Sequence, residues 1–124
     1  MEEFNTHRLV KSEDLNHHGT LFAGRTSEWF VESGFIAVTH YLKPENIVCV
    51  KIHGMLFTKP VQRGDIVKFS SKAVYSGRSS ITAYIKMMVN EKSSPVVDGF
   101  ITFVNVDKNG MPANHNILLI PETD

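Results

Sequence analysis

The chain has 124 residues, which is enough for one domain that buries a sizeable core. Its 13 Lys and Arg residues balance its 13 Asp and Glu residues, and 42% of the residues are hydrophobic. This composition is typical of a globular protein and argues against both a nucleic-acid-binding protein and a disordered chain. We therefore expect one domain, residues 1–124.

Residues 1–15 alternate weakly in polarity and predict an edge strand that ends in a polar cluster. Residues 24–42 contain no proline and predict a helix with apolar side chains on almost every side. One narrow polar stripe breaks that surface, since Arg25, Glu28, Glu32 and Thr39 project in similar directions. Pro44 disfavours helical geometry just before it, so the helix should end there.

Four β-branched and aromatic segments follow, at residues 47–59, 65–75, 78–90 and 96–107, separated by glycine- and proline-containing turns. The DKNG turn at 107–110 precedes a short tail. One helix with four or five strands predicts an α+β fold with a single antiparallel sheet. A helix that is apolar on nearly all sides must be wrapped by this sheet or covered by a second copy, so we expect a homo-oligomer.

The one cysteine, Cys49, lies in the apolar run IVCVKI, where a small buried thiol fits and no intrachain disulfide can form. This favours a reducing, cytoplasmic setting. The N-terminus lacks a signal-peptide pattern, and no apolar run approaches the roughly 20 residues that span a bilayer. We expect a soluble protein without a membrane partner.

Several motifs together resemble the hotdog-fold acyl-CoA thioesterases of the long-chain acyl-CoA hydrolase type. They are NHHGTLFAGR (16–25) with Trp29 and Glu32, FTKPVQRGDIV (57–67), VYSGRSS (74–80) and FVNVDKNGMP (103–112). The resemblance covers about residues 8–112. It implies a long central helix wrapped by a curved antiparallel sheet of five or more strands, and assembly as a dimer or a hexameric trimer of dimers.

The resemblance also implies hydrolysis of an acyl-CoA thioester to a free acid and coenzyme A, with no cofactor besides the substrate's own coenzyme A. Asn16 matches the asparagine that holds water or substrate. A helix N-terminus supplies unpaired N–H groups and a positive dipole end. We therefore expect the backbone of Phe22, Ala23 and Gly24 to form an oxyanion hole, with Gly24 allowing close approach.

The expected catalytic aspartate is missing, because its position, fifteen residues after Asn16, holds Val31. Glu32 matches the glutamate that often follows that aspartate, but one helical residue turns a side chain by about 100°. Three alternatives stay open. Glu32 replaces the aspartate as the catalytic acid; the oxyanion donors and Asn16 suffice for slow hydrolysis; or the chain is a non-catalytic acyl-CoA-binding protein.

Coenzyme A carries phosphates, so its site needs basic residues beside an apolar channel. The candidates in the family-like segments are Lys59, Arg63, Arg78, Ser79 and Ser80. His17 and His18 are adjacent, which is poor spacing for a metal site, and we expect none. A dehydratase or an acyl-carrier-protein enzyme of the same fold lacks its expected histidine and acid arrangement here. Serine-hydrolase and phosphate-loop motifs are absent from the sequence.

Overall fold

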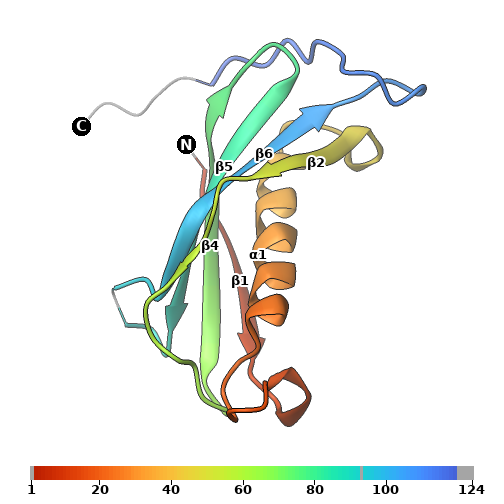
Figure 1. Cartoon of the computed structure of the whole chain (residues 1–124). Coiled ribbons are helices and arrows are strands. Elements are labelled where there is room, and N and C mark those ends of the chain that lie inside the picture. The colour runs from red at the N-terminus through yellow and green to blue at the C-terminus, as the bar shows by residue number, and fades with distance from the viewer. Residues whose placement is uncertain (1, 93, 120–124) are drawn as a thin grey trace.

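The computed structural model describes residues 2–92 and 94–119, which form one long helix against one antiparallel sheet (Figure 1). The elements are β1 (Phe4–Leu9), a 3-10 turn (Ser12–Asp14), α1 (Ala23–Val38), a second 3-10 turn (Pro44–Asn46), β2 (Ile47–Ile52), β3 (Leu56–Phe57), β4 (Ile66–Ser76), β5 (Ser80–Val89) and β6 (Val97–Asn105). No helix in this described part is both long and apolar enough to cross a membrane.

The six strands are ordered β1-β4-β5-β6-β2, and the short β3 also pairs with β6. Every pairing is antiparallel. The sheet curves beside α1, which runs along its inner face (Figure 1). The predicted α+β class, the wrapped helix and the hotdog architecture are therefore confirmed.

The core lies between α1 and the inner face of the three long strands. Fully buried side chains alternate along β4, β5 and β6 and meet one side of the helix. The largest are Phe30 on the helix and Phe69, Phe103, Ile81, Ile85, Met87 and Ile101 on the strands. Gly34 lets the helix approach the sheet, because a Cβ there would lie 3.1 Å from Ile85 Cδ1. A buried hydrogen bond of 3.2 Å from Ser33 Oγ to Ser71 Oγ ties the helix to β4.

The helix is less enclosed than its sequence predicts, since Glu28, Glu32 and Ile36 remain exposed on the side away from the sheet. It also ends at Val38, four residues before the predicted end. The Thr39 hydroxyl bonds to the Ile36 carbonyl at 2.6 Å and competes with the helical pattern there. A turn then leads into the 3-10 segment at Pro44.

The predicted strand 47–59 is two strands, β2 and β3, which pair one after the other with the same edge of β6 and are separated by an irregular segment. Gly54 has a φ of +113°, which glycine adopts easily. A Cβ on Gly99 of β6 would lie only 2.3 Å from the Gly54 carbonyl oxygen, so the irregular segment between β2 and β3 approaches β6 at a glycine. This break directs Phe57 back toward the start of α1.

Strand β2 is an edge of the sheet with apolar side chains in solvent. Val48, Val50 and Ile52 are 42, 55 and 46% exposed, and only β6 pairs with this strand among the described residues. Cys49 is also exposed, which corrects the prediction of a buried thiol. The sequence pattern shows that IVCVKI is an apolar strand but does not show that it is unpaired on one side.

The sheet face opposite the helix is more polar, and Tyr84 there donates its hydroxyl hydrogen to Asp98 at 2.8 Å. Partial burial, the hydrogen bond and the carboxylate charge raise the pKa of Tyr84 to about 12, so the hydroxyl stays a donor at neutral pH. The predicted tail after Gly110 lies along the β4–β5 turn, and His115 Nε2 lies 2.8 Å from the Ser80 carbonyl oxygen. Residues 120–124 of that tail lie outside the described residues.

Candidate active site

Asn16 organises the loop that leads into the helix. Its Oδ1 accepts backbone hydrogen bonds from His18 (2.9 Å) and Thr20 (3.1 Å), and its Nδ2 donates to Thr20 Oγ1 at 3.1 Å. The Leu21 amide then donates to the Val61 carbonyl at 2.8 Å, which fixes the end of the loop to the segment before β4. One Nδ2 hydrogen of Asn16 is left for a further acceptor, because an amide nitrogen carries two.

The helix start presents two unpaired amides. The Phe22 carbonyl accepts bonds from the Arg25 and Thr26 amides at 3.0 and 3.1 Å. Ala23 and Gly24 are the first two helical residues, and within the described residues their N–H groups have no backbone partner and no side-chain cap. These two amides and the helix dipole favour an anion in front of them.

Phe22 does not fit the predicted oxyanion hole, because its N–H already donates to the Asp14 carbonyl at 2.9 Å. The Phe22 ring instead explains why residue 24 is a glycine. A Cβ on Gly24 would lie 2.4 Å from Phe22 Cε2, so any larger residue would displace this half-exposed ring. The donor set is therefore reduced to Ala23 and Gly24.

A cavity of about 290 Å³ opens beside these groups. Asn16, Ala23 and Thr26 line one side, and β3 and the segment after it supply the other side through Phe57, Lys59 and Pro60. Met87 and Val97, both almost completely buried, also line it. A polar start and an apolar interior suit a thioester carbonyl attached to an acyl chain.

Two residues of this region were not among the sequence candidates. Asp14 is only 4% exposed, and its carboxylate accepts a hydrogen bond from the Lys11 amide at 2.9 Å. Asp14 Oδ1 lies 3.3 Å from Arg25 Nε, and the Asp14 carbonyl accepts the Phe22 amide. Asp14 therefore holds the helix start through both its side chain and its backbone. Thr26 is 2% exposed and lines the cavity one turn into the helix. The sequence signal for Thr26 is its position: it is a polar residue on the same side of the predicted helix as the apolar Phe30 and Ala37.

Glu32 is not brought to this cavity within the chain. Its carboxylate pairs with Arg8 of β1, and the Arg8 guanidinium lies 5.4 Å from the Trp29 ring centroid. Strand β1 forms one edge of the sheet, whereas the cavity lies toward β3 and β6 near the other edge. The pairing of Glu32 with β1 therefore turns it away from Asn16.

Val31 lies about 100° around the helix from Glu32. It is half-buried and packs against the hydrophobic core. On the helical projection its nearest neighbours toward the helix start are Ser27 and Ala23, on a side that does not carry the Glu32–Arg8 pair. Val31 thus does not share the side of α1 that Glu32 presents to β1.

The predicted coenzyme A residues divide into two groups. Lys59 lines the cavity with Asn16, and Arg63 is exposed in the adjacent loop. Arg78, Ser79 and Ser80 lie at the opposite end of β5 from Met87, roughly 23 Å away at about 3.3 Å per residue. One chain does not bring these three residues to Asn16, and only another copy could supply them.

His17 and His18 are exposed beside the loop, with ring centroids 4.0 Å apart. In the described ranges 2–92 and 94–119, no group of three or more His, Cys, Asp or Glu side chains could hold a metal ion.

Residues 18–94, more than half of the chain, match the family described as the thioesterase superfamily. The chain belongs to the thioesterase superfamily. The matched segment begins in the loop after Asn16 and contains α1 and strands β2 to β5, so it includes the residues that line the cavity except Asn16 and Val97. The family expected from the sequence motifs is therefore confirmed.

Relatives within this superfamily agree with that assignment. The Bacillus subtilis protein named uncharacterized acyl-CoA thioester hydrolase YkhA is 28% identical over 90% of this chain, which spans 66% of that protein's length. An acyl-CoA hydrolase from Staphylococcus aureus, solved with butyryl coenzyme A, is 26% identical with a TM-score of 0.80, over 90% of this chain and 68% of that one. The hexameric thioesterase y2039 from Yersinia pestis is 28% identical with a TM-score of 0.81, over 88% and 91%.

Proposed function

We propose that this protein is an acyl-CoA thioesterase that hydrolyses an acyl-CoA to a free acid and coenzyme A at a low rate. The observation that carries the proposal is the cavity at the start of α1, which Asn16 and Ala23 line and where the first helical amides, of Ala23 and Gly24, have no backbone partner among the described residues. Donors placed where negative charge develops on the thioester oxygen stabilise the transition state. The named activity of the relatives supports the same reaction class.

Water is the nucleophile in this proposal. The thioester oxygen faces the Ala23 and Gly24 amides, and the spare Asn16 N–H holds the attacking water or the carbonyl. Attack forms a tetrahedral oxyanion, which collapses to the acid and releases coenzyme A thiol. No carboxylate of the same chain is placed in this cavity among its lining residues, so general-base assistance is lacking and the rate is reduced.

The missing carboxylate has a specific position. Solved variants of the Staphylococcus aureus hydrolase replace an asparagine and an aspartate that are fifteen residues apart. Asn16 and Val31 have the same separation here. This supports the interpretation that Val31 stands where an acid would act.

We assign Glu32 a structural role. Its ion pair with Arg8 joins α1 to β1, and both side chains are about half exposed. Such a pair contributes up to roughly 1 kcal/mol of stability. The sequence candidate for the acid is thus reassigned to holding the helix in place.

The proposal is tested by hydrolysis of an acyl-CoA chain-length series, with a thiol reagent reporting free coenzyme A. We expect measurable turnover in the wild type and at least half of it in Glu32→Gln, since that carboxylate does not line the cavity. Arg8→Gln is the matched control, because it breaks the same ion pair from the other side. Coenzyme A binding without turnover would instead establish the non-catalytic alternative, and loss of turnover in Glu32→Gln alone would restore Glu32 as the acid.

We also propose that the site is completed by a second copy. The open, apolar β2 edge can pair with another β2 about a two-fold axis. This places the Val31 side of one helix toward the other copy and brings a second chain to the cavity. In this assembly Arg78, Ser79 and Ser80 of one copy contact the substrate bound by the other copy.

Sedimentation velocity at micromolar concentration tests this assembly. We expect a dimer or a hexameric trimer of dimers, because the exposed area of β2 is costly to leave in water and the Yersinia pestis relative is described as hexameric. Active monomers would contradict a site shared between copies.

A further inference from the structure

Thr26 carries a buried hydroxyl group into the lining of the cavity at the start of α1. The residue is 2% exposed and lies one helical turn after Ala23, which lines the same cavity. Thr26 Oγ1 lies 3.5 Å from the Phe22 carbonyl oxygen, whereas O–H···O hydrogen bonds normally span about 2.5–3.0 Å. The hydroxyl is therefore only weakly bonded as a donor. Within residues 2–92 and 94–119, no group donates a hydrogen bond to its oxygen.

The hydroxyl groups nearest in kind to Thr26 have shorter bonds. Ser33 lies on the same side of α1 and is equally buried, but its hydroxyl bonds to Ser71 Oγ at 3.2 Å, and Ser71 donates to the Ser33 carbonyl at 2.8 Å. Thr58 also lines the cavity, and its hydroxyl donates to the Val96 carbonyl at 2.9 Å. Thr26 thus differs from both, because it keeps capacity for a further hydrogen bond.

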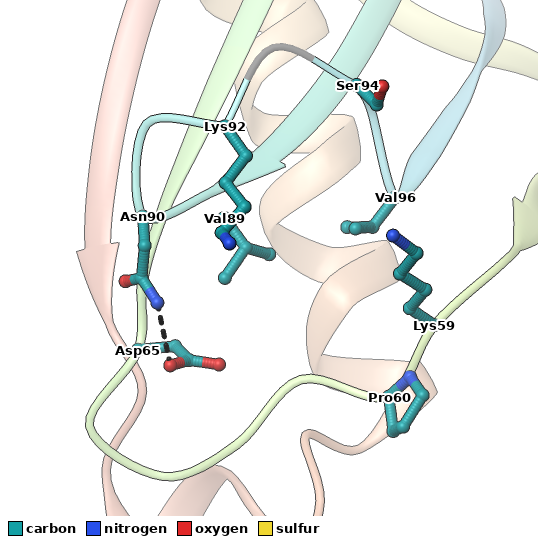
Figure 2. A pocket seen from close by; sticks show the side chains of 8 residues that line it. All are labelled: Lys59, Pro60, Asp65, Val89, Asn90, Lys92, Ser94 and Val96. Carbon is teal, nitrogen blue, oxygen red and sulfur yellow. Dashed lines mark hydrogen bonds between the residues drawn. The ribbon is translucent and has the colours of Figure 1, made fainter.

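A neighbouring cleft supplies no partner for Thr26. Lys59 and Pro60 line both this cleft and the cavity (Figure 2). Inside the cleft, Asn90 Nδ2 donates a hydrogen bond to Asp65 Oδ1 at 2.9 Å, so these two polar side chains bond to each other (Figure 2). The partner that Thr26 lacks must therefore come from a ligand in the cavity.

The other buried residues in the cavity lining are apolar: Leu21, Val61, Met87 and Val97. A hydroxyl group buried among such side chains is unfavourable unless it is hydrogen-bonded. An acyl chain made only of methylene groups fills this space without bonding to Thr26. An acyl chain that carries a hydroxyl group fills it and also supplies the missing bond.

The distance of Thr26 from the helix start indicates which carbon of the acyl group it meets. Three residues separate it from Ala23, which is about 4.5 Å along the helix axis at about 1.5 Å per residue. If the thioester oxygen faces the Ala23 and Gly24 amides, a substituent on the third acyl carbon lies one helical turn deeper, beside Thr26. A hydroxyl group at that carbon can both donate to and accept from the threonine.

We propose that Thr26 determines acyl-group specificity and that the preferred substrate is the coenzyme A ester of a 3-hydroxyacyl group. The proposal rests on the proposed function, because it names the acyl group that the thioesterase site prefers. A site with a polar group for a substrate hydroxyl discriminates against the analogue that lacks it, since its own group is then left unpaired. Thr26 contacts the substrate in this arrangement and takes no part in proton transfer.

The test compares two substrates that differ only in the hydroxyl group, butanoyl-CoA and 3-hydroxybutanoyl-CoA, the second as each enantiomer. The measured quantity is kcat/KM for the better hydroxy enantiomer divided by kcat/KM for the plain ester. We expect a ratio of about 10 in the wild type and about 1 in Thr26→Val, which has a similar shape but no hydroxyl, as the loss of one neutral hydrogen bond predicts. Thr26→Ser retains a hydroxyl and should keep most of the preference.

Ser27→Ala is the matched control on the same helix. Its hydroxyl donates to the Ala23 carbonyl at 2.9 Å, and the residue is not among those that line the cavity. The ratio should not change in this variant. The wild-type ratio and Thr26→Ser keep the test decisive even if Thr26→Val does not fold.

A wild-type ratio of about 1 or less would overturn the proposal, and so would an equal fall in kcat/KM for both esters in Thr26→Val. Failure of the proposed function is a different result, because the wild type would then hydrolyse neither ester. Calorimetry with the same two intact esters then decides the point. A dissociation constant about tenfold lower for the hydroxy ester in the wild type, but not in Thr26→Val, supports the proposal, and equal constants in the wild type refute it.

Discussion

Val31→Asp should raise kcat for acyl-CoA hydrolysis by about 100-fold, because a positioned general base contributes between about 10² and 10⁴. The new carboxylate would project from α1 about 100° around the helix from Glu32, on a side that does not carry the Glu32–Arg8 pair. It could then accept a proton from water at the cavity of a facing copy. Initial rates with saturating acyl-CoA measure the gain.

Val31→Asn is the matched control, because an asparagine side chain has nearly the same shape as an aspartate side chain but carries no charge. Both substitutions replace an apolar side chain that packs against the core, so each should lower the free energy of unfolding by about 1 kcal/mol or more. Only the aspartate should increase the rate. Equal rates for two folded variants would show that a carboxylate at this helix position has no role.

Asn16→Ala should reduce kcat/KM by about 100-fold and also destabilise the protein. The side chain accepts two backbone amides and donates to Thr20, so its loss leaves groups of the loop unpaired at a cost of about 1–3 kcal/mol. The loop positions the free Ala23 and Gly24 amides, and loss of one oxyanion donor alone typically costs 10²–10³ in rate. Steady-state kinetics and thermal unfolding measure the two effects.

Asn16→Asp separates the two roles of this side chain. An aspartate keeps an acceptor for the His18 and Thr20 amides but has no N–H to donate to substrate. We expect a melting temperature near that of the wild type together with a large loss of kcat/KM. Retained activity in Asn16→Asp would mean that Asn16 only shapes the loop.

Much of the fold follows from local sequence signals. The proline-free apolar stretch gives α1, and turn residues separate β4, β5 and β6 within one or two residues of their observed bounds. The division of 47–59 was not foreseen, because it depends on Gly54 meeting Gly99, a contact between residues 45 positions apart. The alternation of polar and apolar residues within one segment does not reveal a contact with a distant segment.

The site residues that belong to recognisable sequence motifs could be predicted. The features of the site that depend on tertiary contacts could not. Asn16 and Lys59 line one cavity with Ala23, as the motif order suggests. The occupied Phe22 amide depends on where the Asp14 carbonyl lies, and the distance of Ser80 from the cavity depends on the direction of β5. Both are properties of the folded chain rather than of residue type.

The apolar edge at β2 affects the stability of a protomer that has not yet assembled with another copy. A lone protomer presents unpaired backbone groups beside Val48, Val50 and Ile52, the surface on which misassembled β-aggregates grow. Self-association and aggregation therefore compete for one strand, with the outcome set by protein concentration and by how quickly correct partners meet. Dilution should thus lower the apparent unfolding temperature, linking the amount of protein made to the fraction that remains native.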